Sequence, residues 1–308
     1  MSISPDISIK LCGLELKNPV MTASGTFGYG SEFDSLIDLN QLGAIVVKGI
    51  SLKPMPGNPP PRIVETPAGM LNAIGLANIG IEKFLTDKLP WLKTLDTKII
   101  VNIYGHSIDE YGELANAFKN VDGVSALEVN ISCPNVDKGG LVFGKDPDMS
   151  ARVTEAVVKN TNKPVIVKLT PNVSDITTLA TAVEQAGAHC LSLINTLTGI
   201  AIDIETGSPK LGNISGGLSG PAIKPVALHM VYQVAKAVKI PIIGIGGILN
   251  ASDALEFFIA GASAVQVGTA NFINPGATLE IIDGIKSYCE RKNLKNIKEI
   301  IGSINLNR

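Results

Sequence analysis

The stretch Ala126-Leu-Glu-Val-Asn-Ile-Ser-Cys-Pro-Asn135 decides how the rest of the chain is interpreted. Its first six residues are typical of a buried strand, and the strand turns abruptly into a loop of amide, hydroxyl and thiol side chains. A thiol at a strand end, beside amides, can act as a base toward a planar ligand rich in hydrogen-bonding groups. The alternative is that Cys133 is a small packing residue before a turn.

Seven other short apolar runs resemble the first. The predicted strands are Pro19–Ala23, Ala44–Val47, Lys98–Ile103, Ala126–Ile131, Pro164–Leu169, Cys190–Ile194, Pro241–Ile245 and Ala264–Val267. The predicted helices between them are Ile108–Lys119, Met149–Asn160, Ile176–Ala186, Ala222–Val238 and Ala251–Ala260. This alternation implies parallel strands joined by crossovers, and eight units predict an α/β protein with one closed (β/α)8 TIM barrel, a single domain over residues 1–308.

Three segments fall outside this rhythm. Ile7–Leu16 alternates around Gly13 and is predicted as an N-terminal hairpin at the bottom of the barrel. Gly49–Gly80 and Leu197–Gly220 are rich in Gly with Pro, Ser or Thr, and each follows the carboxyl end of a predicted strand. We expect both to be long unstructured active-site loops at the C-terminal face of the barrel.

The residues at the carboxyl ends of the strands predict a ligand site. In order they are Ser24-Gly25, Lys48-Gly49, Asn102, Asn130, Lys168, Asn195-Thr196, Gly246-Gly247 and Gly268-Thr269. A barrel interior needs only apolar filling, so a ring of amides and lysines is unfavourable unless a ligand satisfies it. The alternative is that these side chains bond one another and ordered water.

The last two strand ends favour a phosphate. Gly244-Ile-Gly-Gly247 and Gly268-Thr269 follow the seventh and eighth strands, where barrels often bind phosphate through backbone N–H groups and a short helix. The spacing of the first motif does not match a dinucleotide fingerprint. A mononucleotide is therefore favoured over NAD.

Two strand-end lysines, Lys48 and Lys168, need an explanation. They can support an anionic ring or carboxylate electrostatically, or one can form a Schiff base as in barrel aldolases. Ordinary salt bridges are the third interpretation.

Composition excludes several function classes. The 308 residues carry a net charge of −2 with no long run of one sign, which argues against a nucleic-acid or anionic-membrane surface. No export signal and no apolar run of roughly 18 residues is visible, so a cytoplasmic protein is expected. The cysteines and histidines are scattered, so we predict no metal site, disulfide framework or iron–sulfur cluster in this chain.

Five motifs together indicate a family. They are Asn18-Pro-Val-Met-Thr-Ala-Ser-Gly25, Gly57-Asn-Pro-Pro-Pro-Arg62, Asn72-Ala-Ile-Gly-Leu76, Asn130-Ile-Ser-Cys-Pro-Asn135 and Gly217-Leu-Ser-Gly-Pro-Ala-Ile-Lys-Pro225. In this order they resemble the class 1 dihydroorotate dehydrogenases, FMN-containing barrel enzymes of pyrimidine (UMP) biosynthesis. Residues 66–76 and 192–196 are similar to the catalytic subunit of class 1B. Thr22 stands where relatives often have proline, and residues 208–215 match poorly.

The resemblance implies a role for each matching residue. Cys133 would be the base that removes the C5 proton of (S)-dihydroorotate while C6 gives hydride to flavin N5. The implied substrate-binding residues are Lys48, Asn72, Ala73, Ile74, Gly75, Leu76, Asn130, Asn135, Asn195 and Thr196. The implied FMN-binding residues are Ser24, Lys48, Gly49, Asn102, Asn130, Lys168, Ile194, Gly220, Gly246, Gly247, Gly268 and Thr269.

The class 1B resemblance also implies a partner. A second subunit would carry FAD and a [2Fe-2S] cluster and pass electrons to NAD, with this chain forming the homodimeric core of a heterotetramer. Fumarate or another oxidant stays open as acceptor. Three rival functions also stay open: a flavin reductase of uracil-like rings, a Schiff-base aldolase using Lys168, and a non-catalytic subunit that binds a phosphate ligand.

Overall fold

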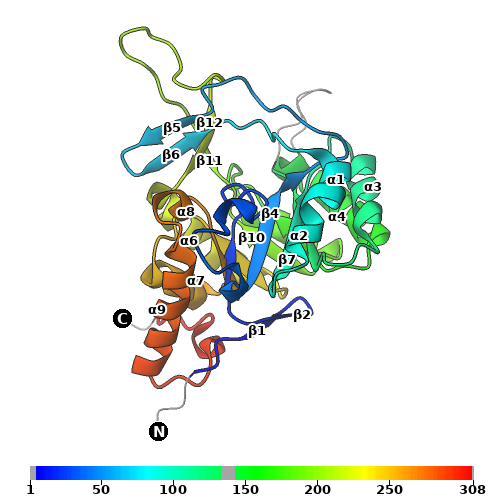
Figure 1. The fold of residues 1–308 in the computed structure, drawn as a ribbon. Helices are drawn as coiled ribbons and strands as arrows, with labels where there is room; N and C mark the ends of the chain where they lie inside the picture. The colour runs from blue at the N-terminus through cyan, green and yellow to red at the C-terminus, as the bar shows by residue number, and fades with distance from the viewer. Residues whose placement is uncertain (1–4, 133–142, 307–308) are drawn as a thin grey trace.

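Eight parallel strands close into a barrel in the computed structural model, which describes residues 5–132 and 143–306 (Figure 1). The order around the barrel is β10-β13-β14-β3-β4-β7-β8-β9, and every neighbouring pair is parallel. The strands are β3 (Val20–Thr22), β4 (Ala44–Ile50), β7 (Lys98–Ile103), β8 (Ala126–Asn130), β9 (Val165–Lys168), β10 (Cys190–Leu193), β13 (Ile242–Ile245) and β14 (Ala264–Val267). All eight predicted strands, and the predicted barrel, are confirmed.

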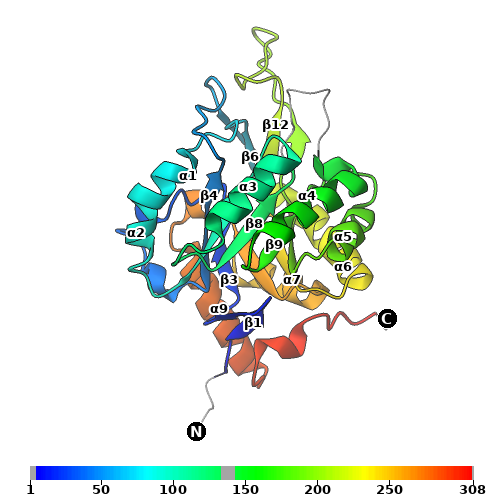
Figure 2. The same ribbon diagram turned by 90° about the vertical axis from the view of Figure 1, so that its right-hand side faces the viewer.

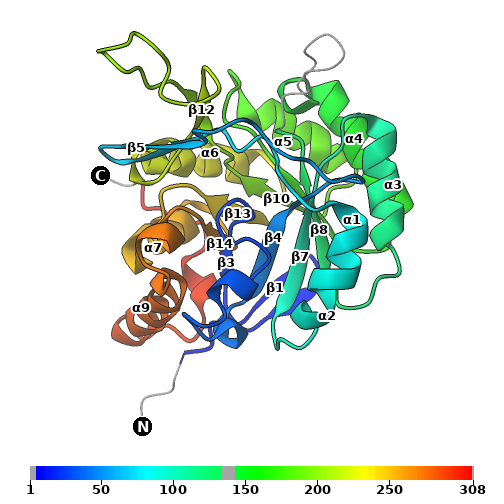
Figure 3. The same cartoon turned by 45° about the horizontal axis from the view of Figure 1, so that its top comes forward.

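The five predicted helices are present and lie outside the ring of strands (Figure 3). They are α3 (Ile108–Phe118), α4 (Pro147–Asn160), α5 (Ile176–Gln185), α6 (Lys224–Ala237) and α7 (Ala251–Ala260). Side chains of Ser107, Asp146, Asp175 and Asn250 cap four of them by accepting a first-turn N–H. Gly261, with φ 121°, follows α7, where a residue with a side chain would be strained.

Further helical segments complete the connections. After β4 the chain forms α1 (Gly80–Lys83) and α2 (Leu89–Leu92), joined by a π-helical turn at Phe84–Lys88. After β14 it forms α8 (Ala270–Ile273) and α9 (Ala277–Arg291). Short 3₁₀ turns, rather than an α-helix, join β3 to β4. No helix in the described part of the chain is long and apolar enough to cross a membrane.

The two insertions lie at the C-terminal face of the barrel, as predicted, but they are not unstructured, and that part of the prediction was wrong. They pair with each other as an antiparallel sheet of order β11-β12-β6-β5. Its strands are β5 (Ile63–Thr66), β6 (Gly69–Asn72), β11 (Leu197–Gly199) and β12 (Gly216–Ser219). Short, glycine-rich strands carry little periodic signal, and their pairing joins segments far apart in the chain. The sheet lies over one end of the barrel (Figure 1).

The predicted N-terminal hairpin is confirmed at the other end of the barrel (Figure 2). Strands β1 (Ile9–Leu11) and β2 (Leu14–Leu16) pair antiparallel around a turn in which Cys12 and Gly13 have φ of 41° and 89°. The C-terminal segment lies against the chain entering this hairpin, because Asp6 N–H donates to the carbonyl of Lys295 at 3.0 Å.

Candidate active site

The carboxyl ends of the barrel strands surround a cavity of about 660 Å³ beneath the four-stranded sheet. All eight strand ends contribute to its lining, as the sequence predicts for a ligand site at this face. The strand-end residues that line it are Ser24, Gly25, Lys48, Gly49, Asn102, Asn130, Lys168, Asn195, Thr196, Gly246, Gly247, Gly268 and Thr269.

The remaining predicted site residues in the described ranges line the same cavity. Asn72, Ala73, Ile74, Gly75 and Leu76 come from β6 and the segment after it, and Ile194 and Gly220 flank the second insertion. Cys133 and Asn135 lie outside the described residues. The structure therefore brings together every predicted site residue that it describes.

None of the described lining residues is acidic, whereas Lys48 and Lys168 both contribute. Burial lowers the pKa of Lys48, with Glu32 acting to raise it and Arg62 to lower it further. Burial of a cation disfavours its charged form, and a bound anion would restore that charge. The cavity is thus built for a negatively charged ligand.

Asn58 braces the segment after β6. Its N–H donates to the carbonyl of Ile74 at 3.1 Å, and its side-chain amide donates to the carbonyl of Ala73 at 3.0 Å. A Cβ at Gly75, where φ is 69°, would lie 2.5 Å from the Asn58 side chain. Asn72 donates from Nδ2 to the carbonyl of Gly217 at 3.1 Å, which ties the two insertions together.

Amides on β8 and after β10 face each other across the cavity floor. Oδ1 of Asn130 accepts from Ser132 N–H at 3.2 Å and from Nδ2 of Asn195 at 3.4 Å. Oδ1 of Asn195 accepts from Thr196 N–H at 2.8 Å. The polar ring is therefore partly satisfied by its own members. Because the Oδ1 atoms of Asn130 and Asn195 accept these bonds, each side chain can offer a hydrogen on Nδ2 to a ligand.

Glycines at the ends of β13 and β14 bring bare backbone to the cavity. Gly246 and Gly247 have φ of 130° and 71°, and a Cβ on Gly247 would lie 2.8 Å from the backbone nitrogen of Lys224. Thr269 donates from Oγ1 to the Ser219 hydroxyl at 2.8 Å. The described lining offers backbone N–H groups and hydroxyls here, and it contains no side-chain carboxylate. Such a surface suits a phosphate.

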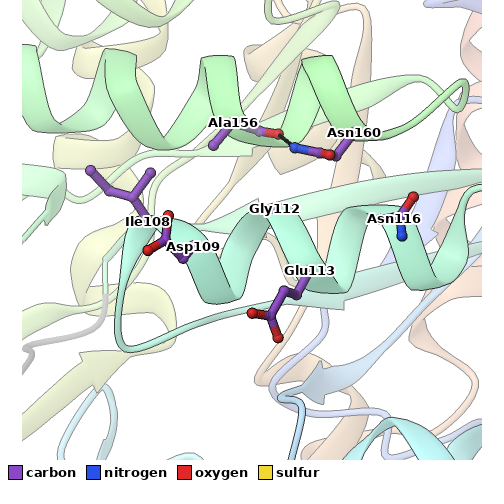
Figure 4. Close-up of a pocket in the computed structure, with 7 residues that line it drawn as sticks. All are labelled: Ile108, Asp109, Gly112, Glu113, Asn116, Ala156 and Asn160. Atoms are coloured by element: carbon purple, nitrogen blue, oxygen red, sulfur yellow. Dashed lines mark hydrogen bonds between the residues drawn. The ribbon is translucent and has the colours of Figure 1, made fainter.

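A second cavity, of about 380 Å³, lies on the outer surface between α3 and α4 (Figure 4). Its walls are Gly112, Glu113, Asn160 and neighbouring residues, and Asn160 there donates to the carbonyl of Ala156 at 2.8 Å. No predicted site residue lines it. Across residues 5–132 and 143–306, no group of three or more His, Cys, Asp or Glu side chains is placed to hold a metal ion.

Comparison with known proteins agrees with this geometry. The family model described as dihydroorotate dehydrogenase matches residues 6–289. The chain belongs to the dihydroorotate dehydrogenase family. It is 58% identical over 302 residues to "Dihydroorotate dehydrogenase B (NAD(+)), catalytic subunit" of Geotalea daltonii, covering 98% of this chain and 99% of that protein. Proteins of the same name from Geotalea uraniireducens and Geobacter sulfurreducens are 58% and 57% identical over 300 residues, covering 97% of this chain and 98% of each.

Sequence reasoning missed three residues that shape the site in this member of the dihydroorotate dehydrogenase family. Asn58 lies in a motif that carries the resemblance but received no role. Asn172 donates from Nδ2 to the carbonyl of Thr196 at 2.9 Å and accepts from Thr198 N–H at 2.9 Å. Glu128 lies two residues before Asn130, so it points to the same side of β8, toward the barrel interior. That spacing is the signal that would have revealed it.

Proposed function

We propose that this chain oxidises dihydroorotate to orotate, as the catalytic subunit of an enzyme that passes the electrons to NAD. One observation carries the proposal: amides, two lysines and bare glycine backbone from all eight strand ends converge on a cavity whose described lining has no acidic residue. Orotate and FMN are both anionic and both have edges rich in hydrogen-bonding groups. Family membership identifies which anions these are.

FMN fits one side of this cavity. We assign its phosphate to the backbone of Gly246, Gly247 and Gly268 and to Thr269, because no side chain there blocks close approach. The isoalloxazine and ribityl chain are assigned to Ser24, Gly49, Asn102, Asn130, Lys168, Ile194 and Gly220. When bound, FMN supplies the two-electron acceptor for the hydride that leaves substrate C6.

The substrate would lie between the flavin site and the four-stranded sheet. Asn72, Asn130, Asn135 and Asn195, with Thr196, offer donors and acceptors that match the carboxylate and ring amides of a pyrimidine. The backbone from Ala73 to Leu76 continues this wall, where Asn58 holds it in place. Lys48 adds a positive charge for the carboxylate.

Cys133 is the proposed base. Its thiolate takes the proton from substrate C5, and with the hydride lost from C6 the ring gains a C5–C6 double bond. A free thiol has a pKa of about 8.5 and is mostly protonated at neutral pH. The surroundings of Cys133 must therefore favour its thiolate for it to act as a base there.

The relatives' name, a catalytic subunit that uses NAD, supports a partner protein. We propose that this partner carries FAD and a [2Fe-2S] cluster and joins a homodimer of this chain in a cytoplasmic heterotetramer. Co-expression with the cognate electron-transfer subunit tests this proposal. Co-purification and dihydroorotate-dependent NAD reduction are expected, whereas transfer only to fumarate would contradict it.

The catalytic proposal is tested on the purified full-length chain without air. We expect yellow protein that releases FMN on denaturation and is bleached by dihydroorotate. Dihydrouracil, which lacks the carboxylate, is the matched control and should bleach it far more slowly. Equal bleaching by both would favour the reductase of uracil-like rings. The aldolase would be favoured if the protein were colourless and borohydride coupled a carbonyl substrate to Lys168. The non-catalytic binding subunit would be favoured if the protein held flavin that neither substrate bleached.

A further inference from the structure

A carboxylate is buried inside the barrel directly beneath the candidate site. Glu128, on β8, is fully buried, and its neighbours come from four other strands. Its oxygens accept from Nδ2 of Asn102 at 2.6 Å, from Oγ of Ser192 at 2.9 Å and from Nε2 of Gln266 at 2.7 Å. Nζ of Lys168 lies 4.0 Å from Oε2. A barrel interior is normally filled by apolar side chains, so this cluster requires a reason.

The cluster is organised around Glu128. All three hydrogen-bonded neighbours donate to it, which matches an ionised carboxylate because that group only accepts. Gln266 uses its amide nitrogen on Glu128, and its own Oε1 is buried with no hydrogen-bond partner in the described structure. Turning this amide would place its oxygen against the carboxylate. The side-chain carbonyl of Gln266 is therefore left without a hydrogen bond, while its amide nitrogen donates one to Glu128.

Lys168 connects this cluster to the cavity. Its side chain is almost completely buried and lies between Glu128 below and the hydroxyl of Ser24, 3.5 Å from Nζ, above. Lys168 and Ser24 line the cavity, whereas Glu128 does not. Within residues 5–132 and 143–306, Lys168 is the only cation in an ion pair with Glu128. The carboxylate is thus paired with the lysine on the side away from the cavity.

Asn102 is oriented by the same carboxylate. Because its Nδ2 donates to Glu128, its Oδ1 lies toward Gly49, where an added Cβ would be 2.9 Å from that oxygen. Both residues line the cavity. Glu128 therefore determines that Asn102 offers an acceptor at the floor of the site.

We propose that Glu128 is a positioning residue for the flavin site: it anchors Lys168, orients Asn102, and sets the net charge beneath the bound ring. The charge effect on flavin rests on the proposed function, whereas the anchoring of Lys168 does not. Removing the negative charge should leave Lys168 more effective at stabilising the added negative charge of reduced flavin.

The anchoring is tested on flavin-free protein by a double-mutant cycle of Glu128→Gln and Lys168→Met in urea unfolding. Each single change leaves a buried group without its partner, so the double variant should be more stable than additivity predicts. We expect a coupling of about tenfold in the unfolding equilibrium constant. Additive effects would overturn the proposal.

The charge effect is tested by the midpoint potential of the bound flavin. Glu128→Gln should favour flavin reduction by about tenfold, a rise of about 30 mV for a two-electron couple. The shift should largely disappear in the Lys168→Met background. Ser192→Ala is the matched control, because it removes one bond to Glu128 but keeps both charges.

Each outcome has a separate meaning. Wild-type protein that binds no flavin would contradict the proposed function, while the urea cycle would still test the anchoring. A flavin potential unchanged by Glu128→Gln, or shifted equally with and without Lys168, would overturn the positioning role. If Glu128→Gln does not fold, the double variant should fold because the unpaired ammonium is gone. Failure of the double variant as well would show that Glu128 acts only in the barrel core.

Discussion

Lys48 is a cation in a cavity wall that disfavours its charge. Burial lowers the pKa of Lys48 in the folded protein below the ordinary value of 10.5. In the pH window between this lowered pKa and 10.5, the folded protein binds fewer protons than the unfolded chain. Stability therefore rises as pH increases through that window, and the penalty is fully present below it. A site that carries this penalty without ligand is prepared for an anion.

Replacing Lys48 by methionine tests this penalty. Lys48→Met should stabilise the flavin-free protein below the window, and the gain should vanish as pH rises toward 10.5, measured by urea unfolding at several pH values. The same variant should bind orotate more weakly at neutral pH by titration calorimetry. A stability difference that does not change with pH would contradict the assigned cause.

The role of Cys133 is inferred from the sequence, since this residue lies outside the described residues. Cys133→Ser should slow flavin reduction by dihydroorotate strongly and move its optimum to higher pH, because an alcohol is the weaker acid and gives up its proton less readily. Stopped-flow absorbance over a pH series measures both effects. Cys289→Ser, in α9, is the control thiol, and wild-type-like rates for Cys133→Ser near neutral pH would remove its role.

The four-stranded sheet is the element that covers the barrel mouth. It depends on glycine at close approaches: a Cβ on Gly69, with φ 150°, would lie 2.0 Å from the carbonyl oxygen of Ser219. That contact joins β6 to β12 and so joins the two insertions. The wall that carries Asn72 is therefore held on one side by β5 of its own insertion and on the other by β12 of the second insertion.

Gly69→Ala should loosen this sheet while leaving the barrel intact. We expect a local cost of about 1–3 kcal/mol, faster amide exchange in residues 63–72, and weaker orotate binding. Gly207→Ala is the matched control, because Gly207 also has a positive φ, 67°, but nothing lies within 4 Å of the added Cβ. Hydrogen exchange followed by mass spectrometry distinguishes the two, and equal effects would show that strain alone is responsible.

On the scale of the whole molecule, the two ends of the barrel differ in structure. The ligand cavity and the four-stranded sheet occupy one end, and the hairpin and C-terminal segment close the other (Figures 1 and 2). Ile297, fully buried, belongs to the closing segment. Residues at that end are expected to affect stability rather than chemistry.

Ile297→Ala should lower the free energy of unfolding by about 2–5 kcal/mol because it leaves a cavity in packed surroundings. FMN affinity, measured by fluorescence below the unfolding transition, should stay unchanged. Ile304→Ala is the control, since Ile304 is 43% exposed and its loss should change stability little. A parallel loss of flavin affinity in Ile297→Ala would show that the two ends are coupled.

The sequence by itself determined the barrel and the position of its site. In runs such as Lys98–Ile103 every residue after the first is buried, and the polar or glycine residues at the strand ends are visible without coordinates. Parallel closure then places all these ends at one face, so the residues meet although they are far apart in the chain.

Only the tertiary structure revealed the sheet over the site and the charge beneath it. Asn72 and Gly217 are 145 residues apart, and their strands are too short and glycine-rich for periodicity to show. Glu128 looks like an irregularity in an apolar strand until Lys168, Asn102 and Gln266 are placed around it. Strand formation follows from local side-chain pattern, whereas cross-strand pairing and the satisfaction of a buried charge depend on neighbours that only the closed barrel supplies.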